Sequence, residues 1–309
     1  MTMQFGTRLF ALAALLPVAG SALAAPPVRT SAPVLRWSRP SVAVSLSGRY
    51  ASARPLVEQV GPSGPRDVSS IVRWTVGDPA VVVVEDGILR PRGDGETVVR
   101  AQLKGSTIAM PVRVHGFAAT TPRFVRDVVP VLTRLGCNQG GCHGATQGKG
   151  GFKLSLQGYD PDSDFLSITR GAAGRRVAPS RPEASLLLRK PTGAVAHKGG
   201  KLLEANSPHW QLLVDWIASG MPGPRKDDNS LSKLDIVPST RILPVGSVQR
   251  FRVMASFSDG TTRDVTQESL FSGSNAQVAN VSPDGSTQVV GKGESAVLVR
   301  YDDKVVTAT

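Results

Sequence analysis

Two distant stretches of this 309-residue chain match each other. RDVSSIVRW, from Arg66, matches RDVTQESLF, from Arg263, and VVVEDGILRPRGDGETVVRAQ, from Val82, matches VANVSPDGSTQVVGKGESAVLVR, from Val278. The register between the two copies shifts by only one residue along their length. One module therefore occurs twice, which supports the expectation of more than one domain.

Each copy contains short β-rich runs, such as 97–103 and 295–301, separated by Asp-Gly and Gly-x-Gly turns. Glycine supplies the positive φ that such turns need, and regularly spaced short strands are typical of a small antiparallel sandwich. The pattern predicts one β-sandwich over 41–118 and a second over 234–309. The second copy stops before the equivalent of PVRVHGF, so we expect it to be truncated.

The segment between the copies, 120–224, carries the strongest helix signals. TPRFVRDVVPVLTRLG has an apolar helical face that Pro130 must kink or break. SPHWQLLVDWIASGMP has Ser207 and Pro208 in cap and first-turn positions and ends at Gly220. We therefore predict a multidomain chain with a β-sandwich, a mainly α domain and a second β-sandwich.

The N-terminus predicts export. MTMQFGTRLFALAALLPVAGSALAAPP has a positive charge at Arg8, an apolar run over 9–18 and a small-residue end that suits a signal peptidase before Ala25. The run is shorter than the roughly 20 apolar residues that span a bilayer, so we expect a signal peptide over 1–24 and no transmembrane anchor. Linkers are predicted over 25–40 and 225–233, and the protein is placed in the periplasm or at the cell surface.

The net charge of +12 limits the partners. Export makes nucleic acid an unsuitable partner, and the basic residues are scattered rather than gathered into one run. A solvated basic surface explains the charge most simply. Anionic cell-wall polymers or an acidic redox partner are the alternatives.

Both cysteines lie in GCNQGGCHGA, where His143 directly follows Cys142. Covalent haem attachment usually needs C-x-x-C-H, but four residues separate Cys137 from Cys142 here. Two thioether bonds and an adjacent iron ligand would account for all three side chains. A Cys137–Cys142 disulfide is the alternative in an oxidising compartment, and a zinc site, which needs four ligands, is a third.

Longer motifs of the chain resemble those of known protein families. The central segment resembles the cytochrome-c-like domain of large exported planctomycete proteins, through FVRDVVPVLTRLGCNQGGCHGATQGKGGFKLSLQGYDPDSDF and LVDWIASGMP. The two copies resemble the bacterial immunoglobulin-like (Ig-like) domain of group 2. This resemblance implies haem c bound through Cys137 and Cys142, with His143 as proximal iron ligand, in the front part of a longer architecture.

A distal iron ligand is expected in the loop before the last helix of the central segment. His197 in AVAHKGGKLL lies there, with Met221 as the alternative and His209 as a weaker one. Arg175 and Arg176 could contact haem propionates, because guanidinium matches carboxylate geometry. Solvated arginines are the simpler explanation.

The acidic run DPDSD from Asp160 has two interpretations. It resembles the start of a calcium loop, but Phe165 and Gly171 stand where that loop needs glycine and glutamate. A helix start, with Asp160 as cap and Pro161 in the first turn, is the preferred prediction.

The function predicted from the sequence is an exported c-type cytochrome domain protein that transfers electrons or senses redox state, with Ig-like modules for spacing or surface attachment. Two alternatives remain open: a structural cell-surface adhesin whose central domain is stapled by a disulfide, and the front part of a larger exported enzyme. No serine, histidine and acid arrangement indicates a hydrolase, so no enzyme class is assigned.

Overall fold

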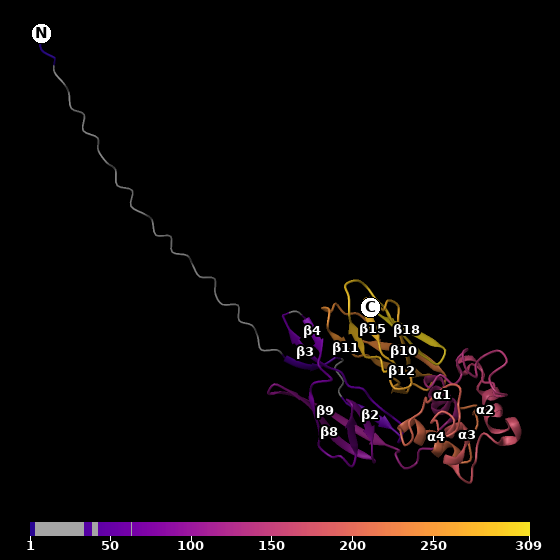
Figure 1. The fold of residues 1–309 in the computed structure, drawn as a ribbon. Coiled ribbons are helices and arrows are strands. Elements are labelled where there is room, and N and C mark those ends of the chain that lie inside the picture. The colour runs from indigo at the N-terminus through magenta and orange to yellow at the C-terminus, as the bar shows by residue number, and fades with distance from the viewer. Residues whose placement is uncertain (4–33, 39–42, 63) are drawn as a thin grey trace. The chain divides into compact units, whose positions relative to one another are not determined.

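The computed structural model describes residues 1–3, 34–38, 43–62 and 64–309 (Figure 1). The contacts group Pro33–Thr309 into one compact unit. The predicted signal peptide over 1–24, apart from residues 1–3, and most of the predicted linker over 25–40 lie outside the described residues. Within the described part of the chain, no helix is long and apolar enough to cross a membrane.

The first copy forms three small sheets from nine strands. The strand orders are β1-β3-β4, β2-β9-β8-β5 and β6-β7. Strand β8 alternates buried and exposed side chains, as a half-buried strand should, so that Val99 enters the core with Val112 and Val114 of β9. The strands are β1 (Val34–Trp37), β2 (Val44–Ser47), β3 (Val57–Gly61), β4 (Gly64–Asp67), β5 (Arg73–Val76), β6 (Val82–Glu85), β7 (Ile88–Pro91), β8 (Gly95–Leu103) and β9 (Ser106–His115).

The second copy also forms three sheets, with the strand orders β10-β12-β13, β11-β16-β15 and β14-β17-β18. Its core gathers Val253, Val265 and Val299, all fully buried. The strands are β10 (Leu231–Val237), β11 (Val248–Gln249), β12 (Arg252–Phe257), β13 (Thr262–Asp264), β14 (Leu270–Gly273), β15 (Ala279–Val281), β16 (Thr287–Val289), β17 (Val297–Tyr301) and β18 (Lys304–Ala308).

Matching backbone contacts confirm the repeat. The Val57 N–H donates to Ser69 Oγ, and the Val253 N–H donates to Thr266 Oγ1, both at 2.8 Å. The backbone N–H groups of Val68 and Val265 then return to the carbonyl oxygens of Val57 and Val253, both at 2.9 Å. The RDV-S/T motif thus makes the same turn in both copies, and Arg54 and Arg250, each three residues before the matched valine, are equivalent.

The central segment holds all the helices of the described residues, and all of them are short (Figure 1). Its core is built around Trp216, fully buried, whose ring lies 5.4 Å from that of Phe124. The helical segments are η1 (Phe124–Val128, π), α1 (Val129–Arg134), η2 (Leu156–Gly158), α2 (Pro161–Thr169), η3 (Gly171–Gly174), η4 (Pro182–Ala184), α3 (Leu186–Arg189) and α4 (Pro208–Ala218).

The predicted helix boundaries are confirmed. Ser207 caps α4 by accepting the Trp210 N–H, and Pro130 lies just after the change from π to α geometry. Asp160 caps α2 by accepting the Ser163 N–H at 3.1 Å, with Pro161 in the first turn, as the preferred interpretation of DPDSD requires.

The predicted fold class is wrong. The chain is mostly β, and the described strands of each copy are divided among three small sheets of two to four strands rather than the two sheets expected of a sandwich. The expected mainly α cytochrome-like domain is also not formed, because α1 to α4 have only four to eleven residues each. Gly136, Gly148, Gly150 and Gly151 adopt positive φ, which a right-handed helix excludes, so the chain between α1 and η2 runs mainly through turns.

Candidate functional site

A cavity of about 790 Å³ in the central segment gathers most of the predicted site residues. Its wall contains both cysteines and two of the four histidines of the chain. The apolar part of the wall comes mainly from leucines and Phe152, with Pro191 and Ala196. The predicted residues that line the cavity are Cys137, Cys142, His143, Arg175, Arg176 and His197.

The two thiols are held by a tight loop. The His143 N–H donates to the Cys137 carbonyl oxygen at 2.9 Å, and the Cys142 N–H donates to the Gln139 carbonyl oxygen at 2.8 Å. Both cysteines are free thiols. Burial and the neighbouring Cys142 raise the pKa of Cys137 to about 12, so this thiol keeps its proton at neutral pH.

The two histidines of the cavity have parallel rings. The ring centroids of His143 and His197 lie 6.4 Å apart with an interplanar angle of 14°. His143 Nδ1 contacts the Phe152 carbonyl oxygen at 3.0 Å, and His197 Nδ1 contacts the Gly200 carbonyl oxygen at 2.9 Å. Burial lowers the pKa of His143, which favours its neutral form.

The other candidate haem-site residues differ in whether they line the cavity and in how exposed they are. Arg176 lies over the Phe152 ring at 4.5 Å and donates to two backbone carbonyl oxygens, whereas Arg175 is exposed at the rim. Met221 packs against the core and does not line the cavity. His209 is also outside the cavity wall, and burial lowers its pKa to about 4.

The prediction of haem c is overturned. Among residues 1–3, 34–38, 43–62 and 64–309, no group of three or more histidine, cysteine, aspartate and glutamate side chains is placed to hold a metal ion. The helical cytochrome fold that would hold an iron centre is not formed either. The predictions of iron binding, cytochrome c character and electron transfer are corrected with it, although the grouping of the thiols and imidazoles in one cavity stands.

The cavity wall is positively charged. Lys149, Lys190 and Lys198 are exposed at its wall, together with the two arginines. The lining contains no aspartate or glutamate. A concave surface lined by one sign of charge concentrates counterions, so the chemistry of this wall suits an anionic group.

A second arrangement joins the two copies of the repeat. The backbone N–H of Arg54 in the first copy donates to Asp264 Oδ2 at 2.8 Å. The backbone N–H of Arg250 in the second copy donates to Asp67 Oδ2 at 2.7 Å. Because Arg54 is equivalent to Arg250 and Asp67 to Asp264, the copies exchange the same hydrogen bond in both directions, like the two halves of a symmetric dimer interface.

Each docking aspartate also closes its own turn. Asp67 Oδ1 accepts both the N–H and the hydroxyl of Ser69, at 2.8 and 2.5 Å. Asp264 Oδ1 accepts the same two groups of Thr266, at 3.1 and 2.5 Å. In both aspartates Oδ1 therefore closes the local turn and Oδ2 accepts from the partner copy, and Asp264 Oδ2 also accepts Arg252 Nε of its own copy.

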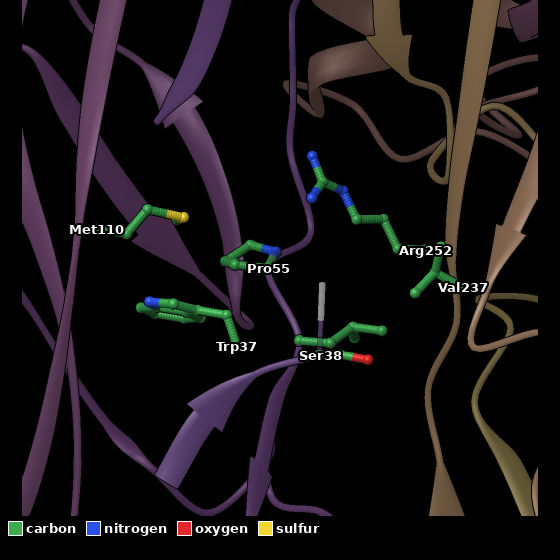
Figure 2. Close-up of a pocket in the computed structure, with 7 residues that line it drawn as sticks. Trp37, Ser38, Pro55, Met110, Val237 and Arg252 are labelled. Carbon is green, nitrogen blue, oxygen red and sulfur yellow. The ribbon is translucent and has the colours of Figure 1, made fainter. Parts of the chain in front are cut away.

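Further buried contacts lie at the interface between the two copies. Arg241 of the second copy pairs with Glu58 of the first, which is only 2% exposed. Arg54 Nη1 donates to the Asp284 carbonyl oxygen at 2.6 Å. Figure 2 shows a crevice at the same interface, lined by residues of both copies that include Trp37 and Arg252. Its volume of about 10 Å³ holds at most about one water molecule, so it is a small packing gap at the interface rather than a ligand site.

The central segment contacts both copies. Tyr50 donates to Asp215 of α4 at 2.8 Å. Arg263 of the second copy pairs with the buried Asp127 at 3.3 Å, and Arg134 donates to the Gln267 carbonyl oxygen at 3.1 Å. These contacts explain why the three segments form one compact unit.

No family model matches the chain. Ice-binding protein 1 of Shewanella frigidimarina is 30% identical over 73 residues, which cover 24% of this chain and 8% of that protein. The chain thus spans a small part of the relative that it matches.

Similar solved structures include those of the S-layer protein SbsC. The chain matches rSbsC(31-844) with 10% identity and a TM-score of 0.23, over 90% of this chain and 27% of that one. It matches domains 5-6 of SbsC with 10% identity and a TM-score of 0.33, over 90% of this chain and 97% of that one. TM-scores this low establish no common fold, so these likenesses support no functional argument.

Proposed function

We propose that the chain is a structural protein of the cell surface, in which the two docked copies hold the basic central segment against anionic envelope polymers. The reciprocal hydrogen bonds between the copies carry this proposal, because they join the modules into one unit rather than a flexible string. The leader-like N-terminus supports export.

The charge distribution favours the central segment as the surface that binds the anionic polymer. Between 120 and 224 the chain has 13 lysines and arginines against seven aspartates and glutamates, whereas 234–309 has seven against eight. The acid-free cavity wall adds a place where several cations converge. Anionic polymers bind such surfaces through charge, and salt weakens that binding.

Charge reversal tests polymer binding. We expect the chain 25–309 to be retained on immobilised polyphosphate at low ionic strength, and Lys149→Glu, Arg175→Glu, Lys190→Glu and Lys198→Glu combined to reduce retention at least tenfold. The control reverses four exposed cations outside the central segment, at Arg66, Arg73, Arg100 and Lys292, with the same change of net charge. Equal loss in both variants would show that net charge alone binds the polymer.

Surface location is tested separately on intact cells. Cells that express the full chain with its own N-terminus should expose it to added protease and to an impermeant amine-reactive label. Recovery only in the soluble periplasmic fraction, protected until the envelope is broken, would contradict a surface role.

A disulfide staple is the second part of this proposal. Cys137 and Cys142 line one wall of the cavity and lie close enough for Cys142 to affect the pKa of Cys137. Export would expose the pair to dithiol oxidases, which remove two electrons and two protons as the S–S bond forms. Closing this short loop should stabilise the fold by about 2 kcal/mol through lost entropy of the unfolded chain.

A Cys137–Cys142 disulfide predicts how many free thiols the exported protein has and how its free energy of unfolding changes when the bond is removed. The exported protein should contain no free thiol after denaturation in an alkylating reagent. Cys137→Ser with Cys142→Ser should lower the free energy of unfolding in urea by about 2 kcal/mol. The wild-type protein under reductant is the control and should lose the same amount. Two alkylated cysteines in the exported protein would disprove the staple.

A further inference from the structure

The turn between β13 and β14, residues 265–269, docks the second copy on the central segment. Within the turn, the Gln267 carbonyl oxygen accepts Arg134 Nε at 3.1 Å. Just before the turn, Arg263 of β13 pairs with the buried Asp127 at 3.3 Å. Glu268 directly follows Gln267, so its side chain belongs to the part of the second copy that contacts the central segment.

The Glu268 carboxyl group is enclosed where the three segments of the chain meet. Its Oε2 atom is buried and has no hydrogen-bond partner among the described residues. Its backbone N–H donates to the Val265 carbonyl oxygen at 3.2 Å, which fixes the turn. Charged and titratable groups face it from all three segments: Arg90 of the first copy, Asp127 and Arg134 of the central segment, and Arg263, Asp264 and Tyr301 of the second copy.

The arginines that face Glu268 are already engaged by other groups. Arg263 and Arg134 make the docking contacts, and Arg90 pairs with Glu85 of its own hairpin at 3.3 Å. Two of the other facing groups are carboxylates, which oppose a third negative charge. A carboxylate buried without hydrogen bonds is costly, so the docked state favours the protonated acid.

Proton release is therefore coupled to undocking. Burial raises the pKa of Glu268 to about 7 from an ordinary value of 4.5. Movement of the turn into water restores the ordinary value, so the acid ionises as the interface opens. The opening equilibrium should increase by up to roughly 300-fold as the pH rises from 4.5 to above 7, because each pKa unit between the two states is a factor of ten.

The two copies also dock through groups outside this turn. The Arg250 N–H donates to Asp67 Oδ2 at 2.7 Å, and Arg241 pairs with the buried Glu58. Neither contact involves Glu268, so the copies can stay joined when the turn leaves the central segment.

We propose that Glu268 is a pH-dependent switch, whose deprotonation releases the central segment from the second copy while the two copies stay docked. The switch rests on the docking geometry and not on polymer binding, so either proposal can fail without the other. It adds a conformational step to the structural role, because the basic central segment is held by both copies at low pH and by the first copy alone at high pH.

Native-state hydrogen exchange of the chain 25–309 in low concentrations of urea tests this switch. The amides of Asp127 and Glu268 report on the two sides of the interface, through their hydrogen bonds to the Arg123 and Val265 carbonyl oxygens. At pH 8 both should exchange at least tenfold faster than β17 amides and depend little on urea, because undocking exposes less surface than unfolding. The Arg250 amide should behave like those of β17.

Glu268→Gln is compared with the wild type at one pH at a time. At pH 8 the variant should slow exchange of the Asp127 amide at least tenfold, and at pH 5 the difference should be much smaller. Glu294→Gln, at an exposed glutamate, should match the wild type at both pH values. If Glu268→Gln fails to fold, the urea dependence of the wild-type protein still decides. Equal Asp127 exchange in the wild type and Glu268→Gln at pH 8, or the same urea dependence for the Asp127 and β17 amides, would overturn the inference.

Discussion

Asp264→Ala is expected to lower the free energy of unfolding by about 4 kcal/mol, measured by urea denaturation at pH 7. Its carboxylate is nearly fully buried and accepts the Arg54 N–H, the Thr266 N–H and hydroxyl, and Arg252 Nε at 2.8 Å. Replacement by alanine leaves several buried donors unpaired, and each unpaired donor costs about 1–3 kcal/mol.

Asp259→Ala is the matched control for this change. Asp259 closes a turn of the same kind, accepting the N–H of Thr261 at 3.0 Å and its hydroxyl at 2.7 Å, but it is exposed and forms no hydrogen bond or ion pair with the described residues of the first copy. Its replacement should change stability only slightly. A similar loss from Asp259→Ala and Asp264→Ala would show that the turn, rather than docking, accounts for the effect.

Glu268→Gln is expected to stabilise the protein at pH 8 by up to about 3 kcal/mol. Burial raises the pKa of Glu268 to about 7 from an ordinary value of 4.5, although Arg263 opposes the shift, and Glu268 Oε2 has no hydrogen-bond partner. The folded state therefore keeps a proton that the unfolded chain releases. Wild-type stability should fall as the pH rises from about 4.5 to 7.

The glutamine variant should lose this pH dependence. Unfolding free energies measured at several pH values between 4 and 8 should converge for the two proteins near pH 4, where both carry an uncharged side chain, and separate above pH 6. Glu294→Gln, at an exposed glutamate of the same copy, is the control and should leave the wild-type profile unchanged. A wild-type stability that rises with pH over this range would contradict the assignment.

Local structure was readable from the sequence because its causes are local. Ser207, Asp160 and Pro130 act within one helical turn, and the matched motifs of the copies make the same turns. The hydrogen bonds that dock the two copies could not be predicted from the sequence. They join residues 183 and 210 positions apart, and nothing in RDV-S/T indicates that the second carboxylate oxygen reaches another module. The occurrence of this aspartate in both copies was the available signal.

The sequence did not predict a cavity. The cavity does bring together Cys137, Cys142, His143 and His197, which the sequence analysis expected at one haem site. The cofactor prediction failed because it transferred a cytochrome fold from motifs around the cysteines. The glycines of that region instead favour turns, and the helices remain too short for such a domain.

Reciprocal docking is tested most directly by amide hydrogen exchange in two single variants. Asp264→Ala should speed exchange at the Arg54 amide in the first copy, and Asp67→Ala should speed exchange at the Arg250 amide in the second copy. Reciprocal hydrogen bonding predicts this crossed pattern, with amides in β8 and β17 remaining protected in both variants. Faster exchange confined to the copy that carries the substitution would contradict it.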